Sequence, residues 1–136
     1  MAARKRVARR AASGKAASKG AAGIERINPG LLYSTAVVHG DTVYIAGQVA
    51  GDPKADITGQ TKSVLARVDA ALKSAGTNKS KLLSCTVYLS DMRHFAAYNA
   101  VYLKWVDKKN KPTRATVQAA LATPEYLIEV VAVAAK

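Results

Sequence analysis

Cysteine is almost absent from this 136-residue chain, in which Cys85 is the only one. A single cysteine excludes an internal disulfide and is typical of proteins kept in a reducing compartment, which favours the cytoplasm. Long apolar runs are also missing: the longest, residues 126–135, contains Glu129 and is far shorter than the roughly 20 residues of a membrane helix. The sequence therefore predicts a globular protein with no membrane partner.

Motifs that hold cofactors or metals are missing too. There is no GxGxxG segment, no Walker-type loop and no CxxC pair, and His39 and His94 are not spaced as metal ligands. We therefore expect neither a cofactor nor a metal.

Acidic residues are absent from residues 1–23, which contain seven Lys and Arg residues. This Ala-, Lys- and Arg-rich segment has little apolar surface to bury, so we expect a disordered basic tail ahead of one domain at residues 24–136. Of the net charge of +12, the domain carries only +5. Three interpretations of the tail stay open: a solvated segment without a specific role, a weak contact for nucleic acid, or a transit peptide directing the protein to mitochondria.

Strand and helix patterns follow one another through the domain in the order β-β-β-α-β-α-β-β. One helix is expected from residue 56 or 58 to residue 76, and a second from a cap at residue 90 or 91 to about residue 106. Five strands are clear from their composition and flanking turns: residues 34–38, 42–46, 82–89, 115–121 and 126–134. The order predicts an α/β (α+β) domain with a mixed six-stranded sheet and both helices packed on one face.

The second face of this sheet has no helix to cover it. Thr86 and Tyr88 must point to that face, together with one of two alternating sets from the last strand. The two sets are Ile128, Val130 and Ala132, or Leu127, Val131 and Val133. Either set leaves too much apolar surface for water, so we expect neighbouring subunits to bury this face.

Glu129 and Arg114 are the leading candidates for chemistry. Glu129 is the only charge in an otherwise apolar strand. Because an unpartnered carboxylate is costly to bury, Glu129 is either a group for acid–base chemistry or a strand-end residue that meets a lysine. Arg114 opens the preceding strand after Pro112, where it is either a rigid fork for a small carboxylate or an ordinary exposed charge.

Three more residues have two interpretations each. Asn99 lies beside the aromatic residues of the second helix, where it either lines a pocket or satisfies nearby backbone groups. Tyr33, at the start of the first hairpin, fits a pocket or the core equally well. Cys85 lies in the apolar phase of its strand, which is more typical of a core residue than of a nucleophile.

Several segments together resemble the reactive intermediate deaminase (Rid, YjgF-like) family, over about residues 24–135. They are residues 34–50, the helix that contains Gln60, residues 86–92, residues 95–99 and residues 112–114 through 128–130. The most specific part is Arg114 followed by Glu129 fifteen positions later. The resemblance implies a chorismate-mutase-like fold and a homotrimer with clefts between its subunits.

The same resemblance implies an enamine/imine deaminase. Such an enzyme hydrolyses reactive 2-enamine and 2-imine acids, for example 2-aminoacrylate, to 2-keto acids and ammonia. Arg114 would clamp the substrate carboxylate, and Glu129 would position or activate the attacking water. Tyr33, Asn99 and Thr116 would line the cleft.

This chain departs from many family members in two places. Thr116 stands where many relatives carry a cysteine, which argues against a thiol-dependent activity, and the loop at residues 51–56 is short. Two other functions stay open. One is a nucleic-acid-associated or endoribonuclease-like protein that uses the basic tail, and the other is a trimer that only binds small carboxylates.

Overall fold

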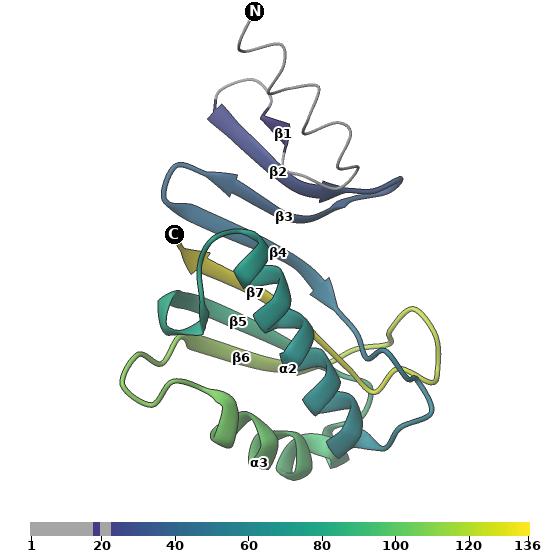
Figure 1. The fold of residues 1–136 in the computed structure, drawn as a ribbon. Coiled ribbons are helices and arrows are strands. Elements are labelled where there is room, and N and C mark those ends of the chain that lie inside the picture. The colour runs from purple at the N-terminus through teal and green to yellow at the C-terminus, as the bar shows by residue number, and fades with distance from the viewer. Residues whose placement is uncertain (1–17, 20–22) are drawn as a thin grey trace, which may run out of the picture.

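The structure, a computed structural model, describes residues 18–19 and 23–136 (Figure 1). Most of the predicted basic tail, residues 1–17 and 20–22, therefore lies outside the described residues. In chain order the elements, with η for a short 3-10 turn, are β1 (Ser18–Lys19), β2 (Ile24–Pro29), β3 (Ser34–His39), β4 (Thr42–Gln48), α2 (Ile57–Ser74), η2 (Lys79–Lys81), β5 (Leu82–Leu89), η3 (Met92–His94), α3 (Phe95–Trp105), β6 (Thr113–Gln118) and β7 (Ile128–Ala135).

All strands belong to one sheet, in the order β1-β2-β3-β4-β7-β5-β6. Neighbouring strands are antiparallel except β5 and β6, which are parallel and are joined by the crossover helix α3. The predicted mixed six-stranded sheet is confirmed for β2 to β7, and β1 adds a short strand at the edge.

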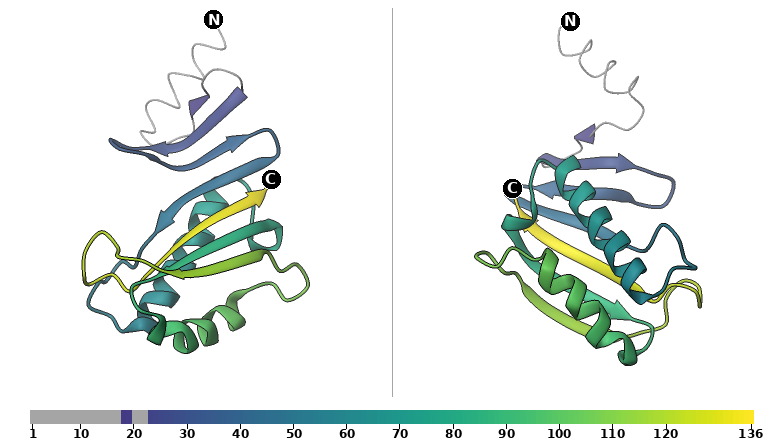
Figure 2. Two further views of the ribbon diagram at one scale, coloured as in Figure 1. Left: turned by 180° about the vertical axis from the view of Figure 1, so that it is seen from behind. Right: turned by 60° about the horizontal axis from the view of Figure 1, so that its bottom comes forward.

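Both helices pack on the same face of the sheet, as predicted (Figure 2). The Asp56 side chain caps α2 by accepting a hydrogen bond from the Gly59 backbone N–H at 2.8 Å. Asp91 caps the η3 turn in the same way, so α3 itself begins at Phe95. Neither helix is long and apolar enough to span a bilayer.

The strand register decides which side chains face the helices. Cys85, Val87 and Leu89 of β5 are buried under them, next to Val130 and Ala132 of β7. Each fully buried aliphatic side chain of this kind stabilises the fold by about 1.5–3 kcal/mol.

The opposite face carries Tyr88 of β5 with Val131 and Val133 of β7, which selects the second of the two alternating sets for these positions. Within the described residues no helix covers this face (Figure 2). Tyr44 and Val117 are exposed on it.

Several strand boundaries differ from the prediction, and the structure explains two of them. β6 ends at Gln118 rather than near residue 121, because its partner β5 ends at Leu89, opposite Gln118. β7 begins at Ile128 rather than near residue 126, because the Leu127 N–H donates at 2.9 Å to the side chain of buried Gln60 on α2. Gln60 thereby fixes the point at which β7 enters the sheet.

Candidate functional site

Arg114 lies on the edge strand β6, beneath three aromatic rings of α3. The rings belong to Phe95, Tyr98 and Tyr102, whose spacing of three and four residues places them on one side of the helix. The guanidinium carbon lies 5.9, 5.4 and 4.6 Å from the three ring centroids, respectively. These distances are those of cation–π contacts, which hold the guanidinium plane at the mouth of the strand.

Asn99 fixes the same guanidinium from the helix. Its Oδ1 accepts a hydrogen bond of 2.7 Å from Arg114 Nη1. Among the described residues this is the one hydrogen bond of the Arg114 side chain, so most of its five N–H donors stay free for a ligand. The predicted carboxylate clamp, Arg114, and the predicted cleft residue Asn99 are thus brought together, in an exposed position.

Thr116 lies two residues along β6, on the same face as Arg114. Its hydroxyl shares a hydrogen bond of 2.7 Å with the phenol of Tyr98, which is almost fully buried. Burial raises the pKa of Tyr98, and the bond to Thr116 partly offsets that rise. Thr116 therefore contributes to the site by holding the ring on which Arg114 stacks.

Cys85 is the β5 partner of Arg114. The side chain is buried in the hydrophobic core, which confirms its interpretation as a core residue. Burial raises the pKa of the thiol to about 11, although the Arg114 charge acts in the opposite direction. The group is therefore a protonated thiol near neutral pH, with none of the thiolate character that a nucleophile needs.

Glu129 lies on the other face of the sheet from Arg114. The β5 partner of Arg114 is Cys85, and the β5 partner of Glu129 is Tyr88. Paired residues share a face and side chains alternate along a strand, so Cys85 and Tyr88, three positions apart, point in opposite directions. Within one chain the structure does not bring the two leading candidate residues together.

The Glu129 carboxylate packs directly over Gly47 of β4. A Cβ atom at Gly47 would collide with Glu129 Oε2. The register of β4 against β7 shifts between Ile45 and Gln48, at the position of this glycine. No local pattern in the sequence indicates this contact, because it depends on which strand pairs with β7 and on the register shift between them.

Tyr33 ends the β2–β3 connection at the far side of the sheet from Arg114, since β4, β7 and β5 separate β3 from β6. It is 69% exposed, and its neighbours Leu31 and Leu32 are 99% and 87% exposed. A hydrogen bond of 2.8 Å from the Gly30 N–H to the Tyr33 carbonyl closes the turn that presents them. Tyr33 and Arg114 therefore do not meet in one chain, and three exposed apolar side chains project from this loop.

Comparison with known proteins gives the family. The family model described as Endoribonuclease L-PSP matches residues 23–136. The RutC family protein YoaB of Escherichia coli K12 is 41% identical over 112 residues, covering 82% of this chain and 97% of that protein. A RutC family protein of Pyrococcus horikoshii is 38% identical over 110 residues, covering 76% of this chain and 86% of its own.

Solved structures are similar in fold as well as in sequence. The crystal structure of NMB1025, a member of the YjgF protein family from Neisseria meningitidis, superposes with a TM-score of 0.82 at 32% identity and covers 86% of this chain and 98% of its own. The crystal structure of an uncharacterized protein from Pseudomonas aeruginosa superposes with a TM-score of 0.80 at 37% identity, over 83% of this chain and 98% of that chain.

Proposed function

Because this chain belongs to the Endoribonuclease L-PSP family, which is also the YjgF and RutC family, we propose that it hydrolyses reactive 2-enamine and 2-imine acids to 2-keto acids and ammonia. The observation that carries the proposal is the arginine of β6. Arg114 is stacked on aromatic rings, is held by Asn99, and keeps free donors directed away from the core. A guanidinium held in this way suits a small carboxylate, which every proposed substrate contains.

The proposed site lies between two subunits of a homotrimer. Arg114 and Glu129 occupy opposite faces of one sheet, so a substrate that touches both needs Arg114 from one chain and Glu129 from its neighbour. The uncovered sheet face and the exposed Leu31 and Leu32 supply apolar surface for such an assembly. The same assembly brings Tyr33 within reach of a neighbour's cleft.

In the proposed mechanism Arg114 binds the substrate carboxylate in two parallel hydrogen bonds and thereby fixes the imine carbon. An enamine substrate first takes a proton at carbon and becomes the imine. Glu129 accepts a proton from water while the water oxygen bonds to the imine carbon, and the proton passes to nitrogen. The hydroxyl proton of the adduct then passes to nitrogen as the C–N bond breaks and the C=O bond forms, so ammonia leaves and one water is consumed for each ammonia released.

The protein needs only a modest rate enhancement, because such imines already hydrolyse in water. Positioning by Arg114 and proton transfer by Glu129 are sufficient for this demand. A chain with a single cysteine fits a reducing compartment, and we propose that the reaction takes place in the cytoplasm.

The test is release of ammonia and 2-keto acid from an imine generated in place by an amino-acid oxidase or dehydratase. Wild type is compared with Arg114→Ala and Glu129→Gln, and both variants are expected to lose the acceleration. Arg93→Ala and Glu125→Gln are matched controls, because both side chains lie on the exposed surface. They are expected to match wild type.

Two other outcomes have clear meanings. If wild type is inert with small and large imines, the deaminase proposal is wrong. If Arg114→Ala abolishes carboxylate binding while Glu129→Gln changes nothing measurable, the protein is a carboxylate-binding trimer. RNA incubated in parallel tests the activity named by the family model.

A further inference from the structure

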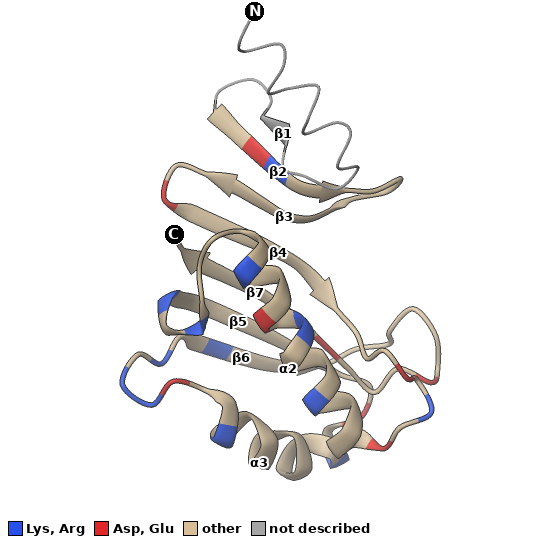
Figure 3. Cartoon of the chain, viewed as in Figure 1, with Lys and Arg blue, Asp and Glu red and all other residues tan. Residues whose placement is uncertain are grey.

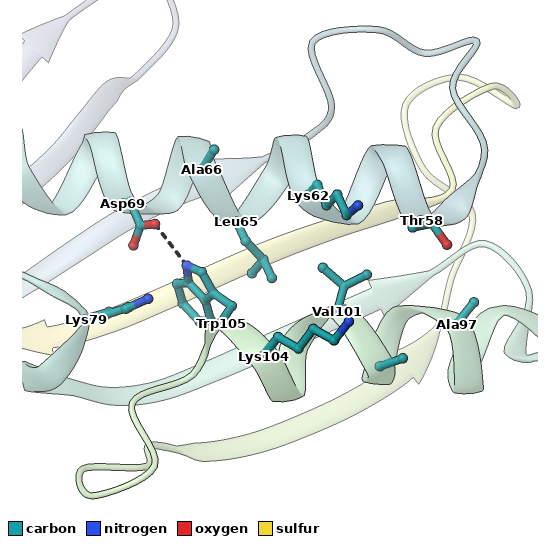
Figure 4. A pocket seen from close by; sticks show the side chains of 11 residues that line it. Thr58, Lys62, Leu65, Ala66, Asp69, Lys79, Ala97, Val101, Lys104 and Trp105 are labelled. Atoms are coloured by element: carbon teal, nitrogen blue, oxygen red, sulfur yellow. Dashed lines mark hydrogen bonds between the residues drawn. The ribbon is translucent and has the colours of Figure 1, made fainter.

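A groove runs between α2 and α3 on the outer side of the helix layer (Figure 4). It has a volume of about 540 Å³. This size is typical of a site for one small organic molecule and is too small for the interface of a second protein. Its apolar lining residues include Leu65 of α2 and Val101 and Trp105 of α3.

The groove is separate from the candidate active site, although α3 contributes to both. Phe95, Tyr98 and Tyr102 of α3 turn toward Arg114 on β6. The groove is lined instead by the side of α3 that carries Val101 and Trp105. A ligand in the groove therefore does not touch Arg114.

Trp105 forms a fixed wall of the groove. Its indole Nε1 donates a hydrogen bond of 2.9 Å to Asp69 Oδ2 on α2. The Lys79 ammonium of η2 lies 5.3 Å from the centre of the indole ring. These two contacts come from different elements, so the aromatic wall is in place before any ligand arrives.

The charge around the groove is positive. Lys62, Lys79 and Lys104 line it, and its only carboxylate, Asp69, already accepts the indole hydrogen bond. Lys62 and Lys104 come from opposite walls, one from each helix (Figure 4). Blue segments on α2, η2 and the end of α3 in Figure 3 mark the same basic region.

We propose that this groove binds a small organic anion with an apolar body. The acid group lies between Lys62 and Lys104, and the body packs against Trp105, Leu65 and Val101. An apolar body alone leaves the lysine charges without a counterpart, and an inorganic anion alone leaves the apolar walls wet. The inference does not depend on the proposed deaminase function.

The chain itself contains a reporter, since Trp105 is its only tryptophan. We would titrate the full chain with 8-anilinonaphthalene-1-sulfonate and follow both quenching of Trp105 emission and the transferred emission of the probe. Saturable quenching is expected. Decanoate is expected to displace the probe, and 1-decanol, which has a similar apolar body without the charge, is expected to be at least about tenfold weaker.

Variants separate the groove from other apolar surfaces that the probe can reach. The double variant Lys62→Ala, Lys104→Ala is expected to weaken binding about tenfold, because each exposed cation contributes modestly. Lys73→Ala is the matched control: it removes an exposed charge from the same helix outside the groove and is expected to bind like wild type. Ala100→Leu narrows the groove with a good helix former and is expected to reduce quenching.

Three results would overturn the proposal. They are an absence of Trp105 quenching, quenching that is unaffected by both the double lysine variant and Ala100→Leu, or equal competition by decanoate and 1-decanol. Far-ultraviolet circular dichroism checks the fold of each variant, which is expected to be retained because all the altered side chains are exposed. Imine hydrolysis is measured on the same samples, so that a failure of the deaminase proposal is distinguished from a failure of ligand binding in the groove.

Discussion

The two faces of the sheet differ in how firmly a single chain holds the candidate residue that each of them carries. On the helix-covered face, Arg114, the proposed carboxylate-binding group, is stacked and hydrogen-bonded within a single chain. On the open face, Glu129 packs over Gly47 and is surrounded by half-exposed apolar residues that no described helix covers. In the proposed mechanism, a single chain therefore holds the carboxylate-binding group in place, whereas the proton-transfer group meets the substrate only in an assembly with a neighbouring copy.

The largest effect is expected for Arg114→Lys, which tests the proposed binding group on the helix-covered face. Lysine keeps the positive charge but loses the planar fork and the stacking on the rings, so we expect kcat/KM for imine hydrolysis to fall by about 100-fold. Arg93→Lys is the control at an exposed arginine. Full activity of Arg114→Lys would mean that charge alone is sufficient and that the aromatic setting is incidental.

Gly47→Ala tests the proposed role of Glu129 on the open face of the sheet. The new Cβ collides with the Glu129 carboxylate and moves it, so kcat should fall about tenfold while carboxylate binding at Arg114 is retained. Gly51→Ala is a suitable control, because the nearest atom to its Cβ is the flexible end of Arg67 at 3.3 Å. An unchanged kcat in Gly47→Ala would separate Glu129 from the reaction.

A smaller effect is expected when only one of the contacts that hold Arg114 is removed. Asn99→Ala removes the hydrogen bond to Arg114 but leaves the stacking, so KM should rise about fivefold with little change in kcat. Asn110→Ala, in the exposed loop after α3, serves as the control. A loss of kcat with unchanged KM would instead indicate that Asn99 acts on the reacting atoms.

The smallest effect is a pH dependence of the free energy of unfolding that comes from Cys85, the β5 partner of Arg114. The folded-state pKa of Cys85 is about 11, above the ordinary thiol value of 9.0. The native state therefore binds more protons between these values, and stability falls as pH rises. The free energy of unfolding should drop by about 1 kcal/mol between pH 8 and pH 10. Urea unfolding of wild type and Cys85→Ala at both pH values measures this, and equal pH dependence in the two proteins would contradict it.

Local features of the sequence predicted much of the fold. Residues a few positions apart determine the caps at Asp56 and Asp91. They also determine which side chains of β5, namely Cys85, Val87 and Leu89, share one face. The clustering of Asn99 with aromatic residues follows from helical spacing in the same way. These features need no knowledge of the strand order.

Features that depend on contacts between distant segments could not be predicted from the sequence. Arg114 and Glu129 lie on opposite faces because the register pairs Arg114 with Cys85 and Glu129 with Tyr88, three positions apart on β5. The contact of Glu129 with Gly47 depends on a register shift, and the late start of β7 depends on the buried side chain of Gln60. Each of these depends on strand pairing or packing between segments far apart in the chain.

The most direct test of the central claim is to mix two inactive variants. Chains with Arg114→Ala and chains with Glu129→Gln, carrying different affinity tags, are expressed together, and mixed oligomers are purified and tested for imine hydrolysis. If each site takes one residue from each of two neighbours in a closed ring of three, every mixed trimer keeps one of its three sites intact, so about one third of wild-type activity is expected. Mixed oligomers as inactive as either parent would contradict a site shared between subunits.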